Sequence, residues 1–323
     1  MSTATLERAA EPPPEPQSSA HAKIDVRDRR KPPLSRFIWR FRLSAICVVL
    51  SACAFMQDPA RIAADTKLDL AINPGGLLTR ALQLWDPQSF SGSLQNQAYG
   101  YFWPMGPFFW VGHTLGVPAW VVQRLWWSML LILAFLGIVK LVRLLGMGGP
   151  LARVVAGLAY ALSPMLLTKI GPLSAEVLPI AIAPWIVFPL VCGASRGSPR
   201  RWAAVSALVI VCVGGINAVA MLAVLPLGGW WILSRANGRR KWALLGWWSL
   251  GIALASVWWT IPLLILGKYS PPFLDWIESS SITTGVTDPD GSSLALAAGW
   301  NHIRVAPTSE LLGRSGRHSF PLR

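Results

Sequence analysis

The residues best suited to chemistry are two carboxylates four positions apart, Asp65 and Asp69. On a helix, residues at this spacing share one face, so a helix here would point both side chains in one direction. Paired carboxylates at a membrane surface can activate a hydroxyl as a general base or hold a divalent cation against a phosphate. A solvated turn, with Lys67 as an ordinary surface charge, explains the same pattern. Spacing alone favours the turn.

Three further acidic residues are candidates for the same site: Glu176, Asp275 and Glu278. Glu176 is either a site carboxylate or a helix-start residue favoured by the positive end of the helix dipole. Asp275 and Glu278 are spaced to share one helical face. They could converge with Asp69 above the membrane, or form a polar helix edge.

One arginine, Arg124, lies near the start of an apolar segment beside Trp126 and Trp127. A guanidinium at such a depth is costly unless it is paired, so it is either an anchor that extends to the membrane surface or a clamp for a phosphate. We favour the clamp, because Lys169 and Lys268 are predicted at the same face.

Several classes of function have no support. The four cysteines all fall in apolar segments, no Cys/His spacing matches a zinc site, and there is no Gly-rich phosphate loop, GxSxG or HExxH motif. The sequence therefore requires no cofactor and leaves only a divalent cation open. The motif at 50–53 matches a lipoprotein cleavage box, but the many apolar segments after it favour chance.

The elements that must position these residues are membrane helices. The chain is 53% hydrophobic and only 14% charged, and it contains 18 Trp, which a soluble domain could not accommodate easily. We predict an all-α polytopic membrane protein, a transmembrane helix bundle of about seven spans. The third to sixth spans are short and interrupted by proline, so one pair could be re-entrant. The predicted spans are approximately 37–57, 119–145, 151–167, 177–194, 202–217, 218–233 and 242–266.

The charges of the chain set its orientation. The net charge of +14 comes from short basic clusters between apolar segments rather than from one soluble face, so we expect no nucleic acid partner. Placing these clusters in the cytoplasm leaves every carboxylate beyond the N-terminal tail on the outer side of the plasma membrane. We predict a disordered basic tail at 1–35, a membrane domain at 36–267 and an extracytoplasmic segment at 268–323.

The first outer loop, about 58–118, is long and apolar. Residues 74–85 predict an amphipathic helix, with Leu77 and Ala81 on its apolar face and Arg80 opposite. Leu78, Leu82 and Trp85 are expected on the apolar face too. A second interfacial element is predicted at 102–115. A loop that packs against lipid suits a substrate with a lipid tail.

Taken together, several stretches are similar to one enzyme family. They are DTKLDL at 65–70, LWDP at 84–87, QNQAYGY at 95–101, PMGPFF at 104–109, VQRLWW at 122–127, GLAYALSP at 157–164 and YSPPFLDWIE at 269–278. Over about residues 37–287 the chain resembles the mycobacterial-type GT-C membrane arabinofuranosyltransferases of the D type.

The resemblance implies a glycosyltransferase that uses decaprenyl-phosphoryl arabinofuranose as donor and extends arabinan in arabinogalactan and lipoarabinomannan. It implies inversion at the anomeric carbon and α-(1→3)-type branching. The family's acidic residue in the first outer loop maps to Asp65 or Asp69, and its later membrane-proximal acid to Glu278. With this chemistry, Asp69 or Glu278 is our expected base and Arg124 binds the phosphate. The remaining candidates for substrate binding are Gln95, Asn96, Gln97, Lys67, Asp275 and Glu176.

The chain departs from the family after about residue 288, where the sequence no longer resembles the family continuation. This leaves a truncated, non-catalytic remnant or scaffold as an alternative. A lipid or sugar transporter is a third interpretation. It would be expected to carry charges buried within a span or an inverted repeat, and neither is clear in the sequence.

Overall fold

The computed structural model describes residues 33–269, except 57–58, 64, 66, 87–91, 95–97, 217 and 236–237. Five predicted site residues lie outside the described residues: Gln95, Asn96, Gln97, Asp275 and Glu278. The predicted cytoplasmic tail and the C-terminal extracytoplasmic segment fall almost entirely outside them as well.

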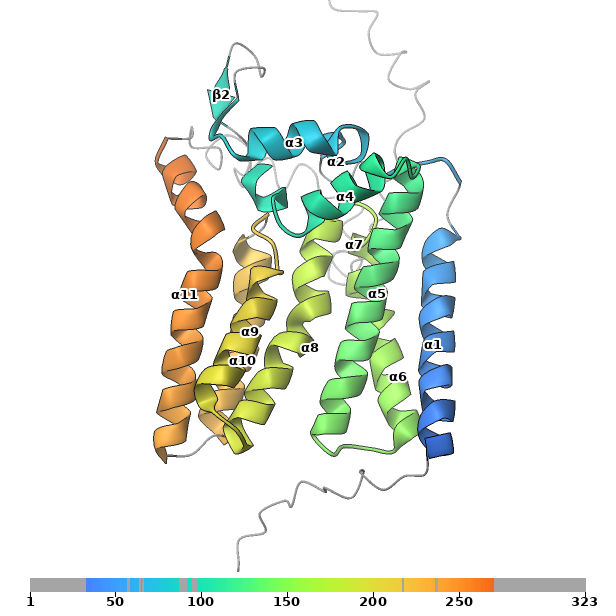
Figure 1. Ribbon diagram of the computed structural model, residues 1–323, viewed down its shortest axis with the longest axis vertical. Helices are drawn as coiled ribbons and strands as arrows, with labels where there is room; N and C mark the ends of the chain where they lie inside the picture. The colour runs from blue at the N-terminus through green and yellow to red at the C-terminus, as the bar shows by residue number, and fades with distance from the viewer. Residues whose placement is uncertain are drawn as a thin grey trace, which may run out of the picture.

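Helices running side by side form the body of the protein (Figure 1). Helix α8 is at its centre and packs against α5, α9, α10 and α11, while α5 also packs against α1 and α6. The predicted all-α bundle is confirmed. The helices of this body are α1 (Pro33–Phe55), α5 (Ala119–Leu144), α6 (Pro150–Ala161), α7 (Pro164–Lys169), α8 (Ser174–Ser195), α9 (Pro199–Val211), α10 (Ala218–Arg235) and α11 (Gly238–Tyr269).

In the described part of the chain, five helical segments are long and apolar enough to cross a membrane. They are Ala119–Leu144, Pro150–Lys169, Ser174–Ser195, Ala218–Arg235 and Gly238–Tyr269. Helix α9 has only 13 residues. At 1.5 Å per residue it extends roughly 20 Å, less than a hydrocarbon core of about 30 Å. The predicted span at 202–217 is therefore shorter than expected, and the count of seven spans stays a prediction.

Helix α8 contains three prolines, Pro179, Pro184 and Pro189, and is the most buried of the apolar segments. A proline has no N–H to donate to the carbonyl four residues earlier. The carbonyl that Pro184 leaves without its helical donor is that of Ile180. The hydroxyl of Tyr160 on α6 donates to this oxygen at 2.7 Å. A neighbouring helix thus supplies the donor that α8 lacks at this carbonyl.

A layer of short elements covers one end of the bundle, and we call this end the loop end (Figure 1). The loop layer contains α2 (Asp69–Ile72), α3 (Pro74–Ala81), β1 (Trp85–Asp86), β2 (Ser93–Leu94), the 3-10 helix η2 (Ala98–Tyr101) and α4 (Met105–Thr114). The two strands pair antiparallel, with Trp85 opposite Leu94.

The predicted amphipathic helix is present as α3, with Leu77 and Ala81 buried against η2 and α4. It is shorter than predicted: it ends at Ala81, and Leu82 and Trp85 are exposed. The apolar face of α3 packs on η2 and α4 rather than on lipid. Two turns of helix are enough to bury it there. The second predicted element is α4.

The loop layer is held on the bundle at two places. Phe108 of α4 packs on Trp126 of α5, with ring centroids 5.2 Å apart. On the other side, the N–H of Gly215, in the turn between α9 and α10, donates to the carbonyl of Gly100 at 3.3 Å. A Cβ on Gly100 would lie 2.6 Å from the main chain of Gly215, so this approach requires glycine.

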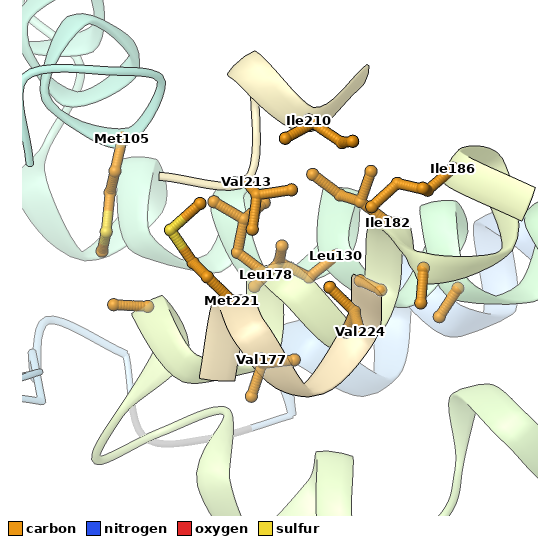
Figure 2. Close-up of a cluster of buried hydrophobic side chains, with 14 of the residues drawn as sticks. Met105, Leu130, Val177, Leu178, Ile182, Ile186, Ile210, Val213, Met221 and Val224 are labelled. Atoms are coloured by element: carbon orange, nitrogen blue, oxygen red, sulfur yellow. The ribbon is translucent and has the colours of Figure 1, made fainter. Parts of the chain in front are cut away.

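The largest group of buried apolar side chains lies under the loop layer. In Figure 2, Leu178, Ile182 and Ile186 of α8 meet residues from four other segments. These partners are Met105 of α4, Leu130 of α5, Ile210 and Val213 at the end of α9, and Met221 and Val224 of α10. This core packs α8 against α5, the two helices to which the candidate site is attached.

Candidate active site

The segment between α1 and α2 is fastened to the start of α5. The amide side chain of Gln123 accepts from the N–H of Ala63 at 2.9 Å and donates to the carbonyl of Ala63 at 2.8 Å. The guanidinium of Arg124 donates to the carbonyl of Arg61 at 3.2 Å. Gln123 and Arg124 are both buried. This segment is thereby held against α5, which lies far from it in the sequence.

Asp65 lies in this segment and is buried, with 4% of its surface exposed. Its carboxylate accepts from the N–H of Ser174 at 2.7 Å and from the Ser174 hydroxyl. The backbone of Asp65 has φ = 40°, an uncommon conformation that aspartate tolerates better than most residues. Burial raises the pKa of Asp65 to about 6, although the hydrogen bonds from Ser174 act to lower it. The solvated-turn interpretation is wrong for Asp65.

Asp69 has a different environment. It is the first residue of α2, its side chain is 58% exposed, and it forms an ion pair of 2.5 Å with Arg80 of α3. Asp65 precedes α2 in a turn rather than on a helix, so the two aspartates do not share a helical face as the spacing had suggested. Lys67 is half-buried between them, and its N–H donates to the carbonyl of Asp65 at 2.9 Å.

Arg124 is buried, with 2% of its surface exposed. Its guanidinium lies 4.2 Å from the centroid of the Trp127 ring, and its Nε has no hydrogen-bond partner in the part of the chain that the structure describes. A side chain buried in this way is not an anchor that extends to the membrane surface. A buried cation with an unused donor suits an anionic ligand. The clamp interpretation stays a prediction.

Glu176 lies in the first turn of α8, where the helix-start interpretation expects it. It forms an ion pair of 2.6 Å with Lys169, the last residue of α7. The pair joins the two sides of the short turn between α7 and α8. This contact brings Glu176 to the loop end near Ser174, and its role as a site carboxylate is left untested.

Three residues that hold the candidate site together were not predicted from the sequence: Gln123, Trp126 and Ser174. Trp126 donates from Nε1 to the Ser174 hydroxyl at 3.0 Å, and Ser174 in turn holds Asp65. Ser174 lies two residues before Glu176 at the start of an apolar run, which signals a helix start. The sequence holds no signal that Asp65 would be its partner, because 109 residues separate them.

Among the described residues, no three His, Cys, Asp or Glu side chains lie close enough together to hold a metal ion. The two loop aspartates are each engaged elsewhere, Asp65 with Ser174 and Asp69 with Arg80. In the described part of the chain, the two aspartates therefore do not share one site.

Comparisons with known proteins agree on one family. Residues 49–293 match the model of the alpha-(1->3)-arabinofuranosyltransferase N-terminal GT-C domain. The chain is 47% identical over 256 residues to an alpha-(1->3)-arabinofuranosyltransferase of Mycobacterium tuberculosis, covering 78% of this chain and 18% of that protein. It is 48% identical over 233 residues to one of Mycolicibacterium smegmatis, covering 71% of this chain and 16% of that protein.

The fold has a counterpart among solved structures. A cryo-EM structure of the arabinofuranosyltransferase AftD from mycobacteria matches with a TM-score of 0.70 and 46% sequence identity. The match covers 74% of this chain and 18% of that chain. The chain therefore spans less than a fifth of the length of the curated relatives that it matches.

Proposed function

The chain belongs to the GT-C alpha-(1->3)-arabinofuranosyltransferase family, and from this premise we propose that its loop end is a site of arabinofuranose transfer. The donor that we propose is decaprenyl-phosphoryl arabinofuranose, and the acceptor is a hydroxyl of cell-envelope arabinan. The observation that carries the proposal is the buried carboxylate of Asp65, held at the loop end close to where α5 supplies a buried arginine.

The proposed reaction is a single displacement. An acceptor hydroxyl oxygen attacks the anomeric carbon of arabinofuranose, and the bond from that carbon to the phosphate oxygen breaks. Decaprenyl phosphate leaves with the electron pair, and a carboxylate receives the hydroxyl proton. Attack from the face opposite the phosphate inverts the configuration from β to α. The polyprenyl phosphate is already a good leaving group, so one base suffices.

Asp65 is the carboxylate that the geometry favours as this base. Its pKa of about 6 is close to neutral pH, where a general base is both ionised and basic enough to accept a proton. Asp69 is exposed to solvent and paired with Arg80, so it is the weaker candidate for the base. Glu278 is a further candidate outside the described residues. This order differs from the sequence-based expectation, which put Asp69 ahead of Asp65.

Arg124 is our candidate for the phosphate ligand. A guanidinium offers several fixed N–H donors to phosphate oxygens, and it is always charged. The guanidinium lies over the Trp127 ring, and its Nε remains a donor without a partner in the described region. A phosphate at this position would satisfy a buried charge that the described residues leave without a carboxylate partner.

Two surface features support an orientation with the loop end outside the plasma membrane. The opposite end collects exposed cations, as expected for the cytoplasmic side. These cations are Arg143, Arg196, Arg200, Arg201, Arg235 and Arg239. At the loop end, Phe102, Trp103 and Trp110 are exposed aromatic residues, which suit the membrane interface and the lipid tail of a donor.

The test uses the full chain in membranes, with a radiolabelled decaprenyl-phosphoryl arabinose donor and a synthetic arabinan acceptor. We expect transfer by the unmodified chain and a loss of at least about 100-fold for Asp65→Asn, a typical contribution of a general base. Asp86→Asn, on β1 of the same loop layer, is the matched control and should retain activity.

Absence of transfer by the unmodified chain, or full activity of Asp65→Asn, would overturn the proposal. Loss of activity in Asp69→Asn but not in Asp65→Asn would move the base to Asp69. Thermal unfolding of each variant separates loss of chemistry from loss of folding.

A further inference from the structure

Three buried side chains form a continuous series of hydrogen bonds at the loop end. Nε1 of Trp126 donates to Oγ of Ser174 at 3.0 Å, and this hydroxyl donates to Oδ2 of Asp65. The N–H of Ser174 also donates to Oδ1 of Asp65, at 2.7 Å. Trp126 belongs to α5, Ser174 begins α8, and Asp65 lies in the segment before α2. Each member comes from a different part of the chain.

The direction of these bonds follows from the chemistry of the groups. An indole N–H can only donate, and an ionised carboxylate can only accept. The hydroxyl of Ser174 has one proton, and the N–H of Trp126 occupies one of its acceptor positions. Its proton is therefore directed to Asp65. One residue thus holds both carboxylate oxygens, through a main-chain N–H fixed by α8 and a hydroxyl oriented by α5.

A second Trp–Ser pair in the same bundle provides a comparison. Nε1 of Trp248 on α11 donates to Oγ of Ser206 on α9 at 3.0 Å, and this hydroxyl donates to the carbonyl of Ile186 at 2.9 Å. Trp248, Ser206 and Ile186 are all buried as well. The two arrangements differ in the acceptor of the serine hydroxyl. For Ser206 it is a main-chain carbonyl, and for Ser174 it is a titratable carboxylate.

We propose that Ser174 and Trp126 are positioning residues that fix the orientation and the ionised form of the Asp65 carboxylate for arabinofuranose transfer. This inference rests on the proposed function, because it assigns Asp65 the role of base. Neither residue touches the reacting atoms. Trp126 acts through Ser174, and Ser174 acts through Asp65.

The effect of Ser174 on Asp65 can be measured through the pKa of the carboxyl group. Among the described residues, the charged groups on the elements around Asp65 are Arg61 and Lys67 on its own segment, Arg124 on α5 and the Lys169–Glu176 pair at the turn between α7 and α8. Burial raises the pKa of Asp65, and the two hydrogen bonds from Ser174 lower it. Removing a donor to the ionised carboxylate should therefore raise the pKa further.

The experiment measures the pH dependence of kcat/KM for the full chain in the transfer assay. A base must be deprotonated, so activity falls at pH values below its pKa. Ser174→Ala should move this acidic limb to higher pH by about one unit, because it removes one hydrogen bond to the charged form. Ser174→Thr keeps the hydroxyl and should restore the original limb. Trp126→Phe keeps an aromatic side chain without the N–H donor and should give a smaller shift in the same direction.

The second pair supplies matched controls. Ser206→Ala and Trp248→Phe remove the same atoms at similarly buried positions, so they should lower thermal stability and leave the acidic limb unchanged. An unmoved limb in both Ser174→Ala and Trp126→Phe would overturn the inference and make Ser174 a purely structural contact between α5, α8 and the segment before α2. If Ser174→Ala does not fold, the acidic limb of Trp126→Phe alone tests the inference.

Failure of this inference is distinguishable from failure of the proposed function. If Asp65→Asn retains full transfer activity, Asp65 is not the base and the proposed function fails at its central residue. If Asp65→Asn is inactive while the Ser174 and Trp126 variants keep the original pH profile, only the positioning roles are lost.

Discussion

Replacing Asp65 with asparagine should change how the stability of the fold depends on pH. The pKa of Asp65 is raised from 3.8 to about 6 in the folded protein. Between these two values the folded state binds a proton that the unfolded state has released. Stability therefore falls as pH rises through this window, and the full cost of burying the charge is present above pH 6. Asparagine has no charge to bury, so the variant should lack this dependence.

The magnitude follows from the size of the shift. About two pH units correspond to about 3 kcal/mol, at roughly 1.4 kcal/mol per unit. Asparagine still accepts from the N–H of Ser174, but its amide cannot accept from the Ser174 hydroxyl, which costs about 1 kcal/mol. We therefore expect Asp65→Asn to be about 1 kcal/mol less stable than the unmodified chain at pH 4 and about 2 kcal/mol more stable at pH 7.

The assay is thermal unfolding in nanodiscs of uncharged lipid from pH 4 to pH 7.5, followed by tryptophan fluorescence. Asp86→Asn is the control for a general effect of removing one acid. The expected result is that the two stability curves cross between pH 4 and pH 7. A variant that is less stable by the same amount at every pH would refute the reasoning, because Asp65 would then be an ordinary helix cap.

Three other perturbations test separate contacts. Arg124→Lys removes the planar donor stacked on Trp127 and should raise the KM for the lipid-linked donor at least about 10-fold, with a smaller change in kcat, as steady-state kinetics would reveal. Tyr160→Phe leaves the carbonyl of Ile180 without its donor and should lower stability by about 1–3 kcal/mol, measurable by denaturation. Gly215→Ala places a Cβ against Trp259 of α11 and should lower the melting temperature and loosen the loop layer, detectable by faster proteolysis of residues 59–114.

The sequence was sufficient for the parts of the fold that depend on hydropathy and charge. Long apolar segments predicted the bundle, and α3 appeared where the apolar periodicity placed it. The place of Arg124 near the start of α5 was predicted, but the sequence left open whether its side chain extends to the membrane surface, and the structure shows it buried beside Trp127. Boundaries were less predictable: α3 ends early because the loop layer supplies its contacts, and α9 is short although the apolar run continues.

The candidate site was only partly predictable, because its geometry depends on contacts distant in sequence. Spacing treated Asp65 and Asp69 as equivalent. They differ because Gln123 binds the main chain at Ala63 and turns Asp65 inward toward Ser174, while α2 begins at Asp69. A local pattern cannot contain a hydrogen bond between residues 109 positions apart. Ser174 could be identified as a helix start, but not as the partner of a carboxylate.

That separation also bears on how the protein is made. At a synthesis rate of about 5–20 residues per second, Ser174 leaves the ribosome roughly 5–20 seconds after Asp65. During this interval the segment carrying Asp65 lacks α8, so its carboxylate lacks both hydrogen-bond donors of Ser174. The raised pKa arises only when α8 has been inserted beside α5. The environment of this residue is therefore completed late in biogenesis, and any delay in inserting α8 would leave a fully synthesised loop without its buried carboxylate.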